Sequence, residues 1–286
     1  MKNHTIAIFL AACLLFIAAH AGWNGAPAVQ GMAPAAAPES PEPVYRLEPE
    51  SVTRTVRSED KRTRELASCA YQLLTLTVAN PEDLSPADME AARRNLEAFN
   101  DRMAVLMEEF EAHALAVGGD AKRAYKGGFL IDTYYDEVIT SGTIMGGVVS
   151  IRMDRSSYTG GAHPNSYASS CLFDLTAGQF IPDPTHLADN PAAFQAGAAE
   201  KLVEKAEAIR ENREAYWQDY AEIISRWNEG TVLFDQEGML AVYSTYELGP
   251  YALGAVELRL GWEELAELMG PDALERMGVE LPEAAE

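Results

Sequence analysis

The chain has 286 residues and a formal net charge of −22, with 44 acidic side chains against 22 basic ones. This acidic surplus disfavours a role in binding nucleic acid or an anionic membrane, because both would repel the chain. At this length a chain buries a sizeable core without disulfide support, so the cysteines are not needed as a structural framework.

The N-terminus has the pattern of a secretory signal peptide over residues 1–21. Lys2 precedes an apolar run from Ile6 to Ala19, and residues 19–21 read Ala-His-Ala, the small-x-small pattern of a signal-peptidase site. As a helix this run rises only about 21 Å, which is short of the roughly 30 Å hydrocarbon core of a bilayer. We therefore expect cleavage after Ala21 and a periplasmic or extracellular protein.

An alternative processing site lies inside the apolar run. Residues 10–13, Leu-Ala-Ala-Cys, resemble a lipobox, and lipidation at Cys13 would anchor the protein to the membrane. The apolar run continues beyond Cys13, which favours cleavage after Ala21 instead. Residues 22–43 are rich in Ala, Pro and Gly and predict a disordered tether between the signal peptide and the folded part.

We expect the exported protein to begin at Gly22. N-terminal sequencing of the protein recovered from the cell envelope tests this, because signal peptidase would release residues 1–21. A lipid-modified N-terminus at Cys13 would support the lipoprotein alternative. A full-length, unprocessed chain in the cytosol would contradict export.

Residues 44–167 are predicted to form the N-terminal half of the folded part. Strands are expected around residues 45–47 and 52–56, and again over 66–78. A long helix follows, with Ser85 as its N-cap and an apolar stripe at alternating spacings of three and four residues, ending at Gly118-Gly119. His113 lies on this stripe and is expected to be a boundary residue with a local hydrogen bond.

The remaining sequence alternates strands with one further helical region. Residues 168–270 are predicted to be the C-terminal half and residues 271–286 an acidic tail. These elements predict an α+β fold with a largely antiparallel sheet packed by two long helices, the two halves sharing one core. The expected elements are strands at 138–139, 148–153 and 167–175, a helix over 190–228 with a break near Asn212, strands at 231–234, 239–244 and 256–262, and a short helix at 263–269.

Two cysteines, Cys69 and Cys171, remain after the signal peptide. An oxidising compartment would allow a disulfide between them, and the sequence leaves open whether it forms. One pair does not make a disulfide framework, so no function is assigned to it.

Two glycine- and aromatic-rich segments contain residue types that core packing alone does not explain. Residues 158–165 read Tyr-Thr-Gly-Gly-Ala-His-Pro-Asn, and the paired glycines permit a sharp turn that would orient His163, either as a site residue or to pin the loop. Residues 243–254 place three tyrosines around a Gly-Pro pair, and rigid amphipathic rings of this kind favour recognition or plug a hairpin end. The candidate ligand-binding residues are Tyr158, Gly160, Gly161, His163, Asn165, Tyr246, Glu247, Pro250 and Tyr251.

With residues 173–179 and 234–240, these two segments resemble the RsiV-like extracytoplasmic domain, which is also the accessory region of PdaC-type peptidoglycan deacetylases. The resemblance covers about residues 44–270 and is strong at the two segments but weak across both long helices. It implies an α+β fold whose two halves share one sheet. It also implies lysozyme as a ligand, since the anti-sigma member of the family binds lysozyme as a stress signal.

The chain departs from both architectures of that family. An anti-sigma protein needs a cytoplasmic segment ahead of its membrane span, whereas only residues 1–5 precede the apolar run here. A deacetylase needs a metal-binding Asp and paired His, and neither Asp-Asp nor His-x-x-x-His occurs in the sequence. Neither sigma-factor control nor deacetylase activity is therefore expected to carry over.

The sequence favours a binding or sensing domain over an enzyme. No P-loop, dinucleotide, Gly-x-Ser-x-Gly or His-Glu-x-x-His pattern is present, so neither a cofactor nor a metal site is expected. The expected ligand is a cell-wall glycan or a cationic wall-degrading protein such as lysozyme, whose approach an acidic surface would steer. The alternatives are a cell-wall glycan hydrolase or deacetylase that uses His163, and a structural protein of the cell envelope.

Overall fold

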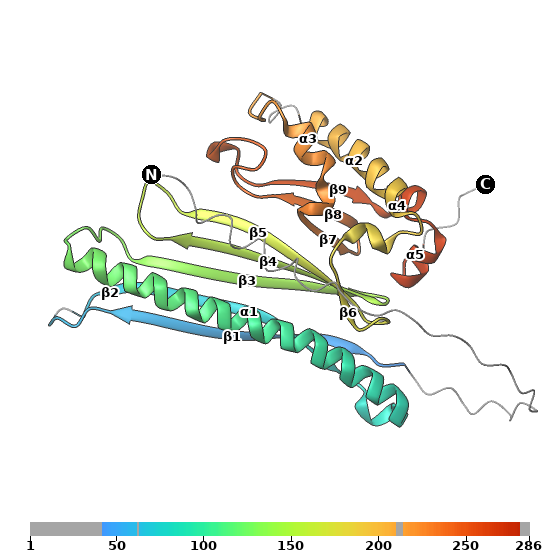
Figure 1. Ribbon diagram of the computed structural model, residues 1–286, viewed down its shortest axis with the longest axis horizontal. Coiled ribbons are helices and arrows are strands. Elements are labelled where there is room, and N and C mark those ends of the chain that lie inside the picture. Colours follow the sequence, from blue (N-terminus) through green and yellow to red (C-terminus); the bar gives the residue numbers. More distant parts are fainter. Residues whose placement is uncertain (1–41, 62, 210–213, 281–286) are drawn as a thin grey trace, which may run out of the picture.

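The computed structural model describes residues 42–61, 63–209 and 214–280, which form two layers of strands with helices on their outer sides (Figure 1). The expected signal peptide and nearly all of the expected tether lie outside these residues. Within the described ranges, no helix is both long enough and apolar enough to cross a membrane.

The first layer is a six-stranded sheet with the strand order β1-β2-β3-β4-β5-β6. Neighbouring strands are antiparallel except β2 and β3, which are parallel and are connected through the long helix α1. Parallel neighbours require such a crossover, and α1 covers one face of the sheet while making it. The elements are β1 (Tyr45–Arg57), β2 (Glu65–Val78), the 3-10 turn η2 (Pro81–Asp83), α1 (Pro86–Lys126), β3 (Tyr134–Met145), β4 (Val148–Tyr158), β5 (Asn165–Asp174) and β6 (Gln179–Ile181).

The second layer is a three-stranded antiparallel sheet with the order β7-β8-β9, covered by short helices. Its elements are η3 (Pro184–Leu187), α2 (Pro191–Ala208), α3 (Tyr220–Ser225), η4 (Trp227–Glu229), β7 (Thr231–Asp235), β8 (Gly238–Tyr243), η5 (Tyr251–Leu253), β9 (Val256–Gly261), α4 (Trp262–Met269) and α5 (Pro271–Arg276).

The predicted α+β class is confirmed, and the six-stranded sheet includes β6 and most of β5 from the expected C-terminal half. The other strands of that half form the second, three-stranded sheet. One buried cluster lies between α1 and the large sheet, and another joins Val148 and Leu172 of the large sheet to the small sheet and helices α2 to α5. A third, smaller cluster lies between the small sheet and β5. The expected boundary between residues 167 and 168 falls inside β5, which belongs to the large sheet. The expected acidic tail begins with α5, whose Ala273 and the following Met277 are 2% and 1% exposed, so this helix packs against the core through one face.

The long helix α1 begins as predicted and ends later than predicted. The Ser85 hydroxyl accepts a hydrogen bond from the backbone N–H of Asp88. Gly118-Gly119 does not end the helix, which continues to Lys126. A Cβ at Gly118 would lie 2.7 Å from Cγ2 of Val56, so this glycine permits the close approach of α1 to β1 rather than terminating the helix.

The second helical region is divided, as the predicted break suggested, but the non-helical stretch is longer than expected. Asn190 caps α2 by accepting from the N–H of Ala193, α2 ends at Ala208, and α3 begins only at Tyr220. Position 212 itself lies outside the described residues. Ahead of α3, the backbone N–H of Trp217 donates to the Leu248 carbonyl in the β8–β9 connection at 2.8 Å. This tertiary hydrogen bond is incompatible with one continuous helix.

The two cysteines are not bridged to each other. Cys69 lies on β2 and Cys171 on β5, with β3 and β4 between them. Three strand spacings alone place their Cα atoms at least about 14 Å apart, and the register puts Cys69 in line with Asn165 instead of Cys171, which lengthens the distance further. This is well beyond the roughly 7 Å limit for a disulfide.

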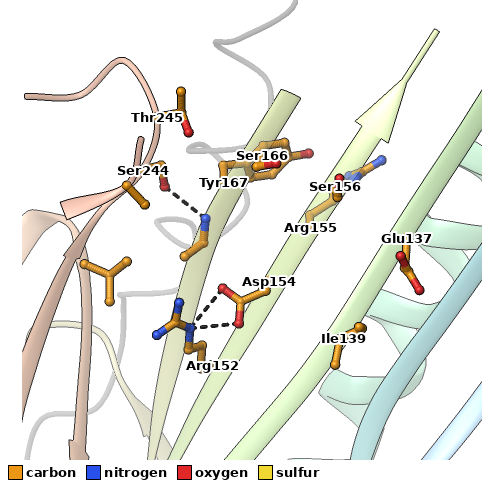
Figure 2. A pocket seen from close by; sticks show the side chains of 13 residues that line it. Glu137, Ile139, Arg152, Asp154, Arg155, Ser156, Ser166, Tyr167, Ser244 and Thr245 are labelled. Carbon is orange, nitrogen blue, oxygen red and sulfur yellow. Dashed lines mark hydrogen bonds and ion pairs between the residues drawn. The ribbon is translucent and has the colours of Figure 1, made fainter. Parts of the chain in front are cut away.

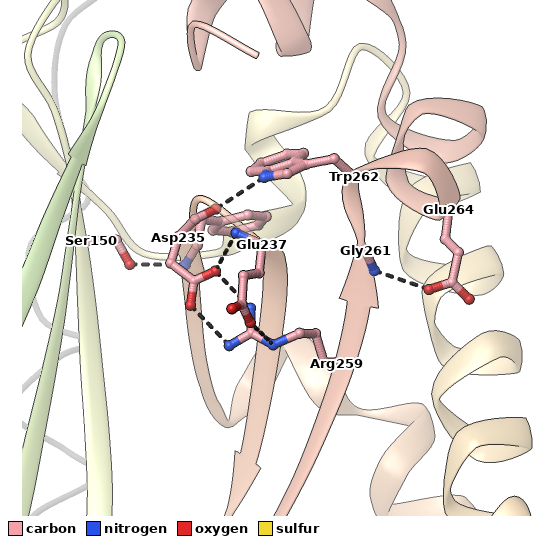
Figure 3. Close-up of polar contacts among 8 residues, drawn as sticks. Ser150, Asp235, Glu237, Arg259, Gly261, Trp262 and Glu264 are labelled. Atoms are coloured by element: carbon pink, nitrogen blue, oxygen red, sulfur yellow. Dashed lines mark hydrogen bonds and ion pairs between the residues drawn. The ribbon is translucent and has the colours of Figure 1, made fainter. Parts of the chain in front are cut away.

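The small sheet docks on the large one through the free edge of β7. The backbone N–H groups of Val232 and Phe234 donate to the hydroxyls of Ser170 and Ser150, each at 2.9 Å. Figure 3 shows the contact at Ser150. At the end of β8, the Ser244 hydroxyl accepts from the Ala168 N–H at 2.9 Å (Figure 2). Serine hydroxyls thus accept hydrogen bonds from backbone N–H groups of the β7 edge that would otherwise be unpaired.

Arg259 on β9 forms ion pairs with Asp235 and Glu237 of the β7–β8 hairpin. Arg259 on β9 donates to both carboxylate oxygens of Asp235 on β7, at 2.6 and 2.9 Å (Figure 3). Burial opposes ionisation of Asp235, but the hydrogen bonds from Arg259 and from the Glu237 N–H hold its pKa below the usual value. Trp262 donates its indole N–H to the Asp235 carbonyl at 3.0 Å, which attaches α4 to the same hairpin.

Replacing Ser150 with alanine tests the docking of the β7 edge. Ser150 is only 3% exposed, so Ser150→Ala leaves the Phe234 N–H buried without an acceptor. We expect the free energy of unfolding in urea to fall by about 1–3 kcal/mol. Ser141→Ala, at an exposed position on β3, is the matched control and should change stability by less than about 0.5 kcal/mol. Equal stability of the two variants would contradict the role given to Ser150.

Candidate functional site

The two segments singled out in the sequence meet at one end of the molecule. His163 lies in the β4–β5 connection, and Tyr246 and Tyr251 lie in the β8–β9 connection. The rings of His163 and Tyr251 stack with their centroids 3.8 Å apart, and the Tyr246 hydroxyl lies 3.1 Å from Nε2 of His163. The large sheet therefore contributes His163, and the small sheet contributes the two tyrosines, to one shared site.

Unusual backbone conformations shape both loops. Gly160 and Gly161 have φ values of 94° and 118°, which side chains other than glycine rarely adopt, and they produce the turn that presents His163. Tyr246 has a φ of 74°, a conformation that costs a non-glycine residue free energy and that is concentrated at functional sites. A Cβ at Gly249 would lie 2.6 Å from the Ala215 carbonyl oxygen, so this glycine lets the tyrosine loop pack on the segment before α3.

A third segment adds an aromatic ring that the sequence reasoning missed. Trp217 donates its indole N–H to the Tyr246 carbonyl at 3.3 Å and is 41% exposed. Tyr246 and Tyr251 are 51% and 37% exposed, so these large rings face solvent instead of filling the core. We call His163, Trp217, Tyr246 and Tyr251 the aromatic surface. No local motif marks Trp217, because its partners lie about thirty residues further along the chain.

A cavity of about 190 Å³ lies beside the aromatic surface, between the end of β8 and the β3, β4 and β5 strands (Figure 2). Ser244 and Thr245, which immediately precede Tyr246, line one wall, and Ser166, which lies three residues after His163, lines another. The full lining is Glu137, Ile139, Arg152, Asp154, Arg155, Ser156, Ser166, Tyr167, Ala168, Val242, Ser244, Thr245 and Ala255.

Arg152 is the central cation on the floor of this cavity. Its Nε lies 2.8 Å from Asp154, and its Nη1 lies 2.7 Å from Glu257 on β9, so it also links the two sheets. Glu137 adds a further acidic group to the lining. The lining thus holds two acidic residues, Glu137 and Asp154, and two basic ones, Arg152 and Arg155, and its hydroxyls come from serine, threonine and tyrosine side chains on a largely apolar surface.

The remaining predicted site residues support the loops. Tyr158 donates its hydroxyl to the Gly161 carbonyl at 3.1 Å, and Asn165 begins β5 opposite Ser157. Glu247 accepts from the Ser244 N–H at 2.6 Å, and burial raises the pKa of this carboxyl group. Pro250 precedes the 3-10 turn η5 that carries Tyr251.

Both ring nitrogens of His163 have partners within the protein. Nδ1 lies 2.9 Å from the Pro164 carbonyl and must be its donor, which leaves Nε2 to accept from the Tyr246 hydroxyl. This pattern defines one tautomer and one ring orientation. Among the described residues, no group of three or more His, Cys, Asp or Glu side chains is arranged to hold a metal ion.

A buried charge network lies on the opposite face of the large sheet. Arg155 donates to both oxygens of Asp136 at 2.7 Å, and Tyr71 donates to the same carboxylate at 2.8 Å. Asp136 is fully buried, and Nε2 of His113 on α1 lies 3.6 Å from it. The sequence pattern placed His113 at the helix boundary but gave no sign of its buried partners, which come from three separate strands.

His113 should make stability depend on pH. Burial and the nearby charge of Arg155 lower its pKa, and Asp136 only partly opposes this. The unfolded chain, with a His pKa of about 6.5, therefore takes up the proton first as the pH falls. We expect the free energy of unfolding to decrease below about pH 6.5 and to level off once the folded-state pKa is passed.

The variant His113→Gln should flatten this part of the stability profile. Urea unfolding of both proteins at a series of pH values between about 7 and 5 measures the difference. An identical decline in the two proteins would show that His113 is not the group responsible.

No family model and no curated protein matches the chain. Among solved structures, it is similar to a DUF3298 family protein from Bacteroides fragilis, with a TM-score of 0.57 and 15% identity over 82% of this chain and 98% of that one. A DUF3298 family protein from Pseudomonas aeruginosa matches with a TM-score of 0.45 and 17% identity over 80% of this chain and 96% of that one. DUF3298 is a domain family of unknown function, and the first likeness supports the fold alone.

Proposed function

We propose that this chain is an exported binding domain that recognises a cell-wall glycan at the aromatic surface and the adjoining cavity. The observation that carries the proposal is the convergence of three solvent-exposed aromatic rings and His163 from three separate segments. Core packing does not require exposed rings, and maintaining Tyr246 at a positive φ costs stability. Such a cost is expected where a side chain is needed for recognition.

The chemistry of the site suits a sugar. Aromatic rings supply rigid apolar area against which the carbon-bound face of a sugar ring packs. The hydroxyls of Ser166, Ser244 and Thr245, together with the acidic groups of the cavity, supply partners for sugar hydroxyls. Export across the inner membrane, proposed from residues 1–21, would bring the domain to the wall.

A cationic wall-degrading protein such as lysozyme is the second candidate ligand. The net charge of −22 favours it, because a strongly acidic surface raises the association rate of a basic partner. In this case the exposed tyrosines and Trp217 would act as the central contacts of a protein interface.

Catalysis by His163 receives less support than binding. Nδ1 of His163 contacts the Pro164 backbone carbonyl instead of a carboxylate, so this nitrogen has no charged partner that would stabilise a protonated imidazole as in a catalytic triad. The stacked imidazole is therefore proposed to orient Tyr246 and Tyr251. A purely structural role in the envelope would leave the exposed rings unexplained.

Isothermal titration of the purified protein with soluble peptidoglycan glycan fragments, and separately with lysozyme, tests the proposal. We expect Tyr251→Ala to weaken binding of the true ligand by about tenfold or more, since one aromatic anchor contributes 1.4 kcal/mol or above. Phe129→Ala is the matched control, because Phe129 is 79% exposed and lies in the connection between α1 and β3.

The salt dependence of binding separates the two candidate ligands. A steered complex with a basic protein should weaken steeply between low and high salt, whereas glycan binding should hardly change. Failure of both ligands to bind at low salt would refute the proposed function. Turnover of glycan fragments that is lost in His163→Ala would establish the enzymatic alternative instead.

A further inference from the structure

The strand register aligns a row of small and hydroxyl-bearing side chains across five strands of the large sheet. Thr53 on β1 is paired with Ala70 on β2, and Ala70 with Glu137 on β3. Glu137 is paired with Ser156 on β4, and Ser156 with Ser166 on β5. Register partners point to the same face of a sheet, so these five side chains form one continuous line, which we call the polar row.

The polar row lies on the face that α1 does not cover. Its neighbours Val138 and Arg155 are 1% and 5% exposed, because they point toward the α1 side. Side chains alternate along a strand, so Glu137 and Ser156 point the other way. The small sheet docks only on a part of this face further along β4 and β5, over Ser150 and Ser170.

A second row runs parallel to the first and supplies aromatic rings. Thr55 is paired with Ser68, Ser68 with Tyr135, and Tyr135 with Tyr158. The rings of Tyr135 and Tyr158 stack with their centroids 6.2 Å apart, and both side chains are partly exposed. The open face therefore combines aromatic rings with a shallow line of hydroxyl groups.

The polar row is continuous with the cavity beside the aromatic surface. Glu137, Ser156 and Ser166 belong to both, and Figure 2 shows Glu137 on β3 at the side of the cavity away from Thr245. Four strand spacings place Thr53 about 19 Å from Ser166 along the row. The site is therefore an extended track open along the sheet, not a closed pocket for one small molecule.

The charge of the polar row and of the second row indicates which kind of polymer can bind there. Glu137 is the one charged side chain in the two rows, so a polyanion would meet a carboxylate here and a net charge of −22 over the whole protein. Hydroxyl groups and tyrosine rings match an uncharged chain that presents hydroxyls and apolar ring faces.

We infer that the polar row binds several consecutive units of an unbranched, uncharged sugar chain that crosses the strands from the aromatic surface toward β1. This inference rests on the proposed function and deepens it, since it specifies an extended polymer and assigns binding to Thr53 of β1 and Ala70 of β2, which do not line the cavity.

Chain length is the decisive variable in the test. The probes are β-1,4-linked N-acetylglucosamine oligomers from two to six units, titrated calorimetrically against the purified protein. We expect the affinity to increase by about tenfold or more from the dimer to the longest oligomers, because each additional sugar unit would contact a further residue of the polar row.

Ala70→Leu places a larger side chain in the middle of the track. We expect it to reduce the affinity for the hexamer to that of the dimer while leaving dimer binding unchanged. Ala104→Leu makes the same chemical change at an exposed position of α1, on the other side of the sheet, and should have no effect. Thr53→Val, at an exposed position at the end of the row, tests the same track with minimal risk to folding.

Each of the three following outcomes would contradict the inference, and each can be distinguished from failure of the proposed function. Binding that does not depend on chain length but is lost in Tyr251→Ala confines the ligand to the aromatic surface and leaves the proposed function intact. Binding of lysozyme but of no oligomer rejects the sugar chain. A dimer in analytical ultracentrifugation that Ala70→Leu dissociates would assign this face to a second copy of the chain.

Discussion

The arrangement of the whole molecule depends on how the free edge of β7 is satisfied. An edge strand that ends against the face of another sheet cannot pair with it as a strand does, because the neighbouring backbone groups are already used. Ser150 and Ser170 solve this by presenting hydroxyls from the large sheet at the positions of two β7 N–H groups. The two sheets are thereby held in one orientation.

That orientation is what creates the site. His163 belongs to a hairpin of the large sheet and Tyr251 to a connection of the small sheet, and their rings stack only because β7 and β8 are seated as they are. The same seating encloses the cavity between Ser166 and Ser244, and it leaves the face of β1, β2 and β3 uncovered. Docking of the small sheet thus sets both the aromatic surface and the extent of the open sheet face.

Local sequence patterns predicted most helices and strands and both loops of the site. They failed where the structure depends on contacts between residues far apart in the sequence. Ser85 and Asn190 were recognisable as caps because a cap is satisfied within three residues. Gly118 was misread as the end of the helix. A glycine is needed there because Val56 of β1 lies close by, and Val56 is far away in the sequence. Trp217 and the Asp136–Arg155 pair were missed for the same cause, since their partners are far away in sequence.

The sequence by itself determined the α+β class, the positions of most strands and the two loops that carry candidate ligand contacts, because periodicity, capping and turn chemistry act over a few residues. Only the tertiary structure decided that there are two sheets, that Cys69 and Cys171 are too far apart to bridge, and that His163 meets Tyr246 and Tyr251. Those outcomes depend on strand order and on side chains such as Ser150, whose partners no local pattern specifies.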